Sequence, residues 1–94
     1  MDNNNVIKYP FVVLFNPEGE KGYVAYAPDL PGCITCGEDE TINNNLILNC
    51  SDALKSWVEI FKEENSEIPK PSKINDIKQQ IAAKSSLVIP ITLD

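Results

Sequence analysis

Two prolines and a glycine lie within five consecutive residues of this chain, and they constrain its backbone more than any other stretch. The segment is PDLPG at residues 28–32. Each proline fixes its own φ angle and biases the preceding residue toward extended conformations, while Gly32 can adopt a positive φ. Residues 23–27 and 33–36 on either side are short, uncharged and typical of strands. We therefore expect a rigid corner between two strands, held in place by the rest of the chain.

The first strand is expected over residues 6–15. Its odd positions are apolar, and Val12 and Leu14 make the other face apolar as well. A strand that is apolar on both faces usually lies inside a sheet or carries a second layer. Pro10 removes one ladder donor, which predicts that the first half of this strand lies at an edge or a bulge. Turn-forming residues then return the chain antiparallel into the second strand.

A single long helix is predicted over residues 42–64. Thr41 is the expected N-cap, and the carboxylates of Glu38, Asp39 and Glu40 just before it favour the positive end of the helix dipole. The apolar residues of this segment recur at the spacing of one buried stripe. They are Leu46, Cys50, Ala53, Leu54, Trp57, Val58 and Phe61.

The remaining segments complete an α+β fold. Residues 66–72, which contain Pro69 and Pro71, stop the helix, and Ile74, Ile77 and Ile81, with Ala82 as a further candidate, predict a short, lightly anchored second helix. Residues 87–93 alternate as a last strand. We expect a two-layer β-β-β-α-β sandwich, with the long helix on one face of a mixed four-stranded sheet. A helical crossover would place the last strand beside the first and parallel to it.

Length and charge narrow the class of protein. The 94 residues are expected to form one domain over 6–94 with a disordered N-terminus at 1–5. A chain of this length buries a small hydrophobic core, so binding to a partner is expected to stabilise it. No leader peptide and no membrane-spanning run are expected. The net charge is −6 and every basic residue is a lysine, so the chain suits a basic protein better than a nucleic acid. Three cysteines cannot all pair, which predicts reduced thiols in a cytoplasm.

The sequence offers few groups for catalysis. There is no histidine, and no serine or cysteine has a visible activating partner. The CxxC at 33–36 lacks further zinc ligands and lies in a predicted strand, which favours small core cysteines over a redox or metal site. A two-metal nuclease would need an acid inside the first strand, which has none. We expect no enzyme activity, no metal and no cofactor.

The corner and its surroundings resemble the HicB antitoxin family. The matching pieces are Tyr9-Pro10, Gly22-Tyr23, PDLPGC at 28–33, Gly37, Asp39, Thr41 and PKPS at 69–72, and together they cover about residues 6–93. The resemblance implies a degraded ribonuclease H-like domain that binds a HicA toxin, a small basic ribonuclease that cleaves mRNA. Antitoxins of the family usually continue into a DNA-binding domain. This chain ends at Asp94, so no direct DNA binding is expected from it.

The leading hypothesis is an antitoxin, or its toxin-neutralising domain, from a HicA/HicB type II system. An acidic, preorganised surface would cover a basic RNA site, with a few buried anchors holding the complex. Two alternatives stay open, namely a stand-alone interaction or scaffold domain without a toxin and, less favoured, a metal-dependent ribonuclease. Self-association into a homodimer or larger oligomer is expected through an exposed last strand. The predicted toxin-binding residues are Tyr23, Asp29, Pro31, Glu38 and Asp39.

Overall fold

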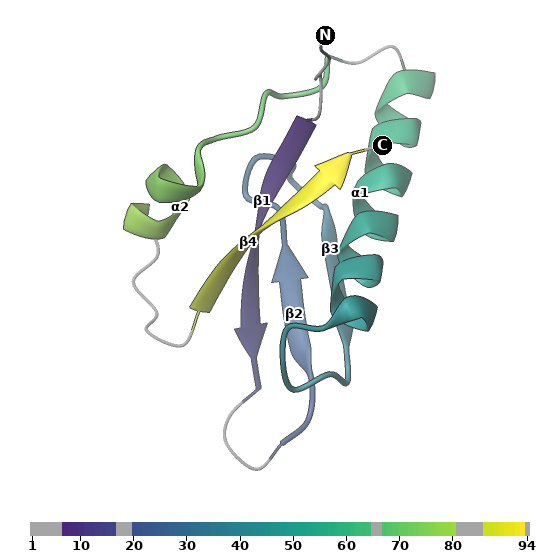
Figure 1. Ribbon diagram of the computed structural model, residues 1–94. Coiled ribbons are helices and arrows are strands. Elements are labelled where there is room, and N and C mark those ends of the chain that lie inside the picture. The colour runs from purple at the N-terminus through teal and green to yellow at the C-terminus, as the bar shows by residue number, and fades with distance from the viewer. Residues whose placement is uncertain (1–6, 17–19, 65–66, 81–85, 94) are drawn as a thin grey trace, which may run out of the picture.

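The computed structural model describes residues 7–16, 20–64, 67–80 and 86–93 (Figure 1). In chain order its elements are β1 (Ile7–Phe15), β2 (Tyr23–Tyr26), β3 (Ile34–Gly37), α1 (Asn44–Glu63), α2 (Ile74–Gln80) and β4 (Ser86–Leu93). The strands form one four-stranded sheet in the order β3-β2-β1-β4. Each pair of neighbouring strands is antiparallel. The expected strands and both helices are therefore present.

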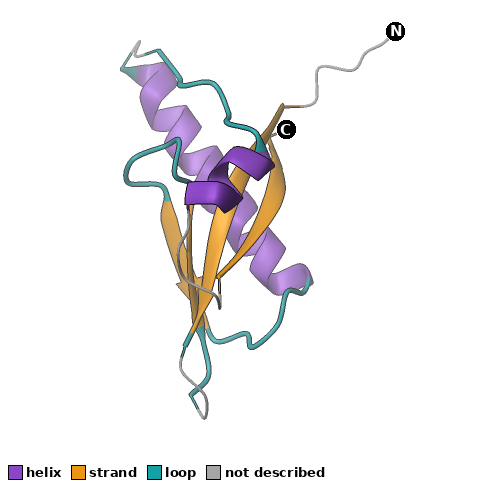
Figure 2. Cartoon of the chain, turned by 90° about the vertical axis from the view of Figure 1, so that its left-hand side faces the viewer, coloured by secondary structure: helices purple, strands orange, loops and turns teal. Residues whose placement is uncertain are grey.

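The two helices lie on opposite sides of the sheet. Figure 1 shows α1 along one side and α2 along the other, and Figure 2 places α2 in front of the strands and α1 behind them. Phe11 and Val13 of β1 belong to the core cluster under α1, whereas Val12 and Ile77 are buried outside that cluster. Successive strand residues point to opposite faces, so Val12 points away from α1 and toward the face that α2 covers. α2 is therefore the second layer expected for a strand that is apolar on both faces. The α+β class, with one long helix on one face, is confirmed.

The expected parallel direction of the last strand is wrong. β4 lies beside β1, as predicted, but pairs with it antiparallel, from Ile7 opposite Leu93 to Leu14 opposite Ser86. α1 returns the chain to the end of the sheet where β1 begins, and a strand starting there would run parallel to β1. The segment 67–73 and α2 instead lead the chain back toward the other end (Figure 1). This second pass reverses β4 and makes the sheet antiparallel throughout.

Strand β1 has two neighbours along only part of its length. Its pairing with β4 extends over residues 7–14, whereas its pairing with β2 covers only Val12 to Phe15. The residues before Val12 therefore have a strand on one side only. This confirms that the half of β1 containing Pro10 lies at a local edge.

Helix α1 begins later than the sequence predicted, because its N-cap is Asn43 and not Thr41. The Asn43 side chain accepts a hydrogen bond from the Leu46 N–H at 2.9 Å. Asp39 in turn accepts one from the Asn43 side-chain amide at 3.0 Å. The first turn of α1 contains no acidic residue, so Asp39 acts on the helix start through Asn43.

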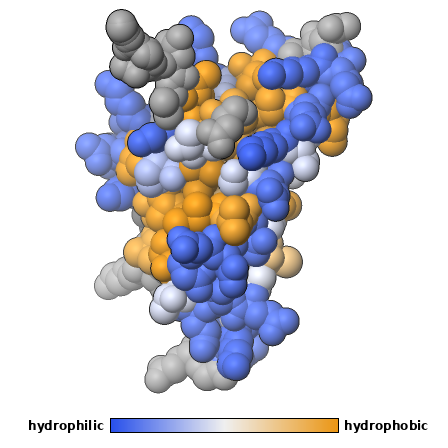
Figure 3. Space-filling model, turned by 45° about the vertical axis from the view of Figure 1, so that its right-hand side comes forward, coloured by the Kyte–Doolittle hydropathy of each residue, from blue (hydrophilic) through white to orange (hydrophobic). Residues whose placement is uncertain are grey.

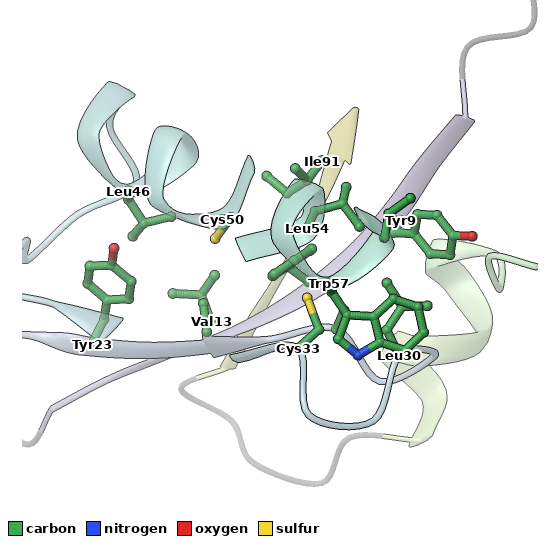
Figure 4. Close-up of a cluster of buried hydrophobic side chains, with 14 residues drawn as sticks. Tyr9, Val13, Tyr23, Leu30, Cys33, Leu46, Cys50, Leu54, Trp57 and Ile91 are labelled. Carbon is green, nitrogen blue, oxygen red and sulfur yellow. The ribbon is translucent and has the colours of Figure 1, made fainter. Parts of the chain in front are cut away.

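The buried face of α1 follows the predicted apolar stripe. Figure 4 shows its side chains meeting those of β1, β4 and the corner in one cluster. Burying side chains of this size contributes about 1.5–3 kcal/mol each, so the stripe fixes α1 on the sheet. Its buried members are Leu46, Cys50, Leu54, Trp57 and Val58, and Ala53 and Phe61 pack against the cluster while partly buried.

Some expectations fall outside the part of the chain that the structure describes. These are the disordered N-terminus at residues 1–5, the start of the first strand at Val6 and the helical position of Ile81. Among the helices described, none is long and apolar enough to cross a membrane.

Candidate protein-binding site

The corner between β2 and β3 closes on itself through backbone hydrogen bonds. The N–H of Leu30 donates to the carbonyl of Ala27 at 3.0 Å, and the N–H of Cys33 donates to the carbonyl of Leu30 at 2.9 Å. The N–H of Ala27 then donates to the carbonyl of Cys33 at 3.0 Å, across the mouth of the loop. In the second turn Pro31 precedes Gly32, whose φ is +90°, as a type II turn requires. The corner is therefore two successive turns.

Two prolines explain why the β1–β2 ladder stops where the corner starts. The last pair of this ladder is Val12 opposite Tyr26. Hydrogen-bonded pairs recur every second residue, so the next such pair would be Pro10 opposite Pro28. The bond from the Asn16 N–H to the Gly22 carbonyl, in the same register, shows that the even positions of β1 face β2. Neither proline has an N–H to donate. The ladder cannot continue, and the chain turns away.

The α1 side of the corner is fixed by a buried leucine and a tryptophan. Leu30 is fully buried in the core cluster, whereas the neighbouring Pro31 and Gly32 are exposed. The indole N–H of Trp57 donates to the Pro31 carbonyl at 2.9 Å, and the Trp57 ring stacks on Phe61 with centroids 3.7 Å apart. Figure 4 shows Trp57 beside Leu30 and Cys33. The tip of the corner is thus exposed on a buried support.

The segment between the helices fixes the corner at Asp29. The Asp29 carboxylate accepts hydrogen bonds from the Ser72 N–H at 2.7 Å and from the Ser72 hydroxyl at 2.5 Å. Tyr9 donates its hydroxyl hydrogen to the Pro69 carbonyl at 2.5 Å. Burial, with a smaller effect from the nearby Asp29 carboxylate, raises the pKa of Tyr9. Asp29 is partly buried and its carboxylate is bonded to Ser72. It therefore stabilises the corner from within the chain.

Tyr23 lies in the interior and not on a docking surface. Only 2% of it is exposed, and its hydroxyl accepts a hydrogen bond from the Asn49 side chain at 2.8 Å. Burial raises its pKa. A Cβ at Gly37 would lie 2.7 Å from the Tyr23 ring, so any other residue at position 37 would require that ring to move. Tyr26 lies three strand positions after Tyr23 and therefore on the opposite face, where it is partly buried.

The exposed predicted residues lie at the two ends of β3. Pro31 precedes the strand, and Glu38 follows it with an exposed side chain. Asp39 is partly exposed and holds Asn43. Gly32, Cys33 and the four residues of β3 lie between the two groups, and the strand alone spans about 13 Å. The structure therefore places Pro31 and the acidic residues along one sheet edge and not in one compact patch.

Sequence reasoning missed an apolar hollow beside the corner. It encloses about 220 Å³ and lies between the start of β3 and the C-terminal half of α1. Ile34 and Ile60 stand at it with 59% and 54% of their surface exposed. Ile60 follows Trp57 by three positions, one step outside the buried stripe, and that spacing was the available signal. The other lining residues are Gly32, Cys33, Ala53, Ser56 and Trp57.

The cysteines divide by burial. Cys33 and Cys50 are buried, and burial raises the pKa of each thiol to about 11. Cys36 is exposed, so the expectation of small core cysteines is right for Cys33 and Cys50 and wrong for Cys36. In the described ranges, no three histidine, cysteine, aspartate or glutamate side chains gather as a metal site would require. The arrangement is typical of an interaction domain whose exposed edge is supported by a tightly packed core.

Comparisons with known proteins agree with this class. A curated relative from Haemophilus phage HP1, an uncharacterized 14.9 kDa protein of the rep-hol intergenic region, is 32% identical over 73 residues. The match covers 78% of this chain and 53% of the phage protein, so the chain spans about half the length of that relative.

Two solved structures share the fold. The N-terminal domain of the Burkholderia pseudomallei antitoxin HicB superposes with a TM-score of 0.73 at 21% identity, over 94% of this chain and 99% of that one. A chain of a HicA3 and HicB3 toxin-antitoxin complex superposes with a TM-score of 0.71 at 19% identity, again over 94% and 99%. At such identities the likeness shows the architecture alone.

The family model for the HicB-like antitoxin of bacterial toxin-antitoxin systems matches residues 9–94. This match covers nearly the whole chain, including the corner and the segment at 69–72. The chain belongs to the HicB-like antitoxin family.

Proposed function

We propose that this chain neutralises a small, basic, mRNA-cleaving toxin of the HicA type by binding it and covering its RNA site. The observation that carries this proposal is the exposed edge that runs from the rigid corner along β3 to the exposed carboxylates of Glu38 and Glu40, within a chain of the HicB-like antitoxin family. The solved complex that shares the fold contains HicA3 with HicB3, which supports a HicA-like partner for this chain.

Charge supports a basic partner. The stretch from Gly22 to Leu54, which contains the corner, β3 and the start of α1, has no lysine or arginine and five carboxylates. An acidic surface of this kind speeds encounter with a basic protein and repels RNA. The partly buried hydrogen bonds to Asp29 and Pro31 hold the corner before binding, which lowers the entropy cost of forming a complex.

The positions of the carboxylates fit an inhibitor that acts by binding and not by catalysis. The carboxylates nearest the corner are either engaged within the chain, as Asp29 is, or exposed to solvent, as Glu38 is. We propose that the chain acts by steric cover and charge complementarity and contributes no catalytic group of its own.

Self-association is proposed on separate grounds. β4 is the last strand of the sheet, and Leu87 on it is 46% exposed. Figure 3 shows apolar residues gathered in the middle of the face that comes forward when the α1 side turns toward the viewer. We propose that copies of the chain meet by packing exposed apolar side chains together, Leu87 among them, and not by pairing their β4 strands. Light scattering at rising concentration tests it, and a strictly monomeric chain at high concentration would refute it.

Co-expression tests the proposed function. A gene for a small basic HicA-like protein is sought beside the gene for this chain, its product is induced in cells with and without the chain, and growth and co-purification are followed. We expect the toxin alone to arrest growth, and the chain to restore growth and to co-purify with the toxin. Persistent arrest without co-purification would refute the function. Metal-dependent RNA cleavage by the purified chain would favour the nuclease alternative instead.

A further inference from the structure

The two edges of the sheet differ in whether they can accept another strand. A strand at an edge presents a row of backbone N–H and C=O groups without strand partners, and another chain can pair with that row. β3 and β4 are the two edges of this sheet. Which of their residues face outward follows from the register.

On β4 a proline lies among the residues whose backbone N–H and C=O groups point away from the sheet, which we call the outward row. Pro90 lies opposite Pro10 in the β1–β4 register, and two prolines cannot exchange hydrogen bonds. The even positions of β4 therefore face away from β1, and these include Val88, Pro90 and Thr92. Pro90 removes the donor in the middle of this row. Proline on an edge is one of the devices by which proteins block strand addition.

On β3 the outward row is complete. The bond from the Ala27 N–H to the Cys33 carbonyl continues the β2–β3 register and shows that the odd positions of β3 face β2. The backbone groups of Ile34 and Cys36 thus point away from the sheet, and neither residue is a proline. Both side chains are exposed, and neither carries a charge. This edge has only four residues, but its outward positions carry neither proline nor charge, which are two of the usual protections against pairing.

Resting on the function proposed above, we propose that the toxin binds by adding an extended segment to the β3 edge. The segment pairs with the outward N–H and C=O groups of Ile34 and Cys36, and an apolar side chain of the segment covers Ile34. Lysine or arginine residues at one end of it meet Glu38 and Glu40, which follow the strand and are exposed. At the other end of β3, the rigid corner at Pro31 prevents the added segment from pairing any further.

Charge selects the toxin over a second copy as the occupant. Two copies paired through β3 would bring together two stretches that each hold five carboxylates and no basic residue between Gly22 and Leu54. Like charges at an interface oppose association, whereas a basic partner gains from the same field.

A proline substitution at the outward row tests the proposed edge. In Cys36→Pro the lost N–H points away from β2, so the internal ladder keeps its bonds while the incoming strand loses a donor and meets the proline ring. Thr92→Pro is the matched control, since it removes an outward N–H from β4. Binding is measured by calorimetry against the HicA-like toxin used in the co-expression test, purified as a catalytically inactive variant. We expect Cys36→Pro to weaken binding at least tenfold and Thr92→Pro to leave it within twofold.

Thiol labelling of the unaltered chain gives a second readout that does not depend on folding of a variant. Cys36 is the exposed thiol, while Cys33 and Cys50 are buried with their pKa raised to about 11. We expect iodoacetamide to label Cys36 readily in the free chain and at least tenfold more slowly in the complex.

The outcomes separate the two proposals. If the unaltered chain does not bind the toxin, the proposed function fails. If it binds but Cys36 stays reactive in the complex, or Cys36→Pro binds as well as the unaltered chain, the β3 edge is excluded while the function stands. Labelling of Cys36 that slows as the free chain is concentrated would identify a second copy as the occupant and overturn the proposal.

Discussion

Asp29 accepts two hydrogen bonds from Ser72, one from its N–H and one from its hydroxyl, across 43 positions of sequence. The pair joins the corner between β2 and β3 to the segment that leads into α2. Hydrogen bonds to a charged group contribute about 1.5–3 kcal/mol, roughly twice the value of neutral ones. The corner therefore depends for its shape on a segment from the other half of the chain.

We predict that Asp29→Asn lowers the free energy of unfolding by about 1–3 kcal/mol, because the neutral amide presents one oxygen where two donors converge. Ser72→Ala keeps the backbone donor and should cost about 1 kcal/mol. Urea unfolding followed by Trp57 fluorescence measures both. The double variant should lose less than the sum of the single losses, since the two residues share one interaction. Additive losses would show that the pair does not act together.

The corner was the part of the site best predicted from the sequence. Proline and glycine restrict the backbone locally, so PDLPG indicated a rigid turn without knowledge of the fold. The stripe on α1 was predictable for the same reason, since a helical period reports which face is buried. Both signals depend on short-range geometry.

The direction of β4 and the place of Tyr23 depend on long-range contacts that no local pattern reports. β4 runs antiparallel to β1 because residues 67–73 pass back along the sheet. Two hydrogen bonds hold this segment, one from the Ser72 N–H to Asp29 and one from the Tyr9 hydroxyl to the Pro69 carbonyl. Alternation shows that Tyr23 and Tyr26 lie on opposite faces but not which face meets α1. Thr41 and Asn43 are both capping residues after acids, so the sequence could not choose between them.

Raising the pH from about 9 toward 11 should destabilise the folded chain. The thiols of Cys33 and Cys50 have a pKa of about 11 in the folded state, against an ordinary value of 9.0. Between these values the unfolded chain has released protons that the folded chain keeps, so stability falls as pH rises. The slope approaches about 1.4 kcal/mol per pH unit for each thiol.

Urea midpoints at pH 8, 9 and 10 measure this slope. The Cys33→Ala/Cys50→Ala variant is the control, and its slope should be shallower although its stability at pH 8 is lower. The slope should not vanish, since burial also raises the pKa of Tyr9 and Tyr23. Equal slopes in the variant and the unaltered chain would contradict the assignment to the buried thiols.

Pro90→Val should promote strand pairing between copies through β4. The substitution restores an N–H in the middle of the outward row and adds a residue that favours strands. Light scattering at matched concentrations should show a larger average mass for Pro90→Val than for the unaltered chain. Ile91→Val, which changes a buried residue on the inward row, is the matched control and should leave the mass unchanged. A variant whose mass equals that of the unaltered chain would show that Pro90 does not protect this edge.

The carboxylates after β3 should affect how fast the toxin binds more than how long it stays bound. Glu38 and Glu40 are exposed, so neutralising them removes long-range attraction without removing a buried contact. We predict that Glu38→Gln/Glu40→Gln slows association about three- to tenfold at low salt and changes dissociation less. Stopped-flow mixing with the inactive toxin at several salt concentrations measures this, and the difference should shrink as salt rises.

Asp39→Ala is the informative comparison, because Asp39 accepts a hydrogen bond from Asn43, the N-cap of α1, and alanine has no acceptor to replace it. Its loss should lower the free energy of unfolding by about 0.5–1 kcal/mol through the helix start, whereas Glu38→Gln/Glu40→Gln should leave stability within about 0.5 kcal/mol. The three acids are consecutive in sequence, yet the structure bonds Asp39 to the helix start and leaves Glu38 and Glu40 exposed, where we propose that they act in encounter. Equal loss of stability in both variants would remove that distinction, and faster dissociation without slower association would place Glu38 and Glu40 inside the interface.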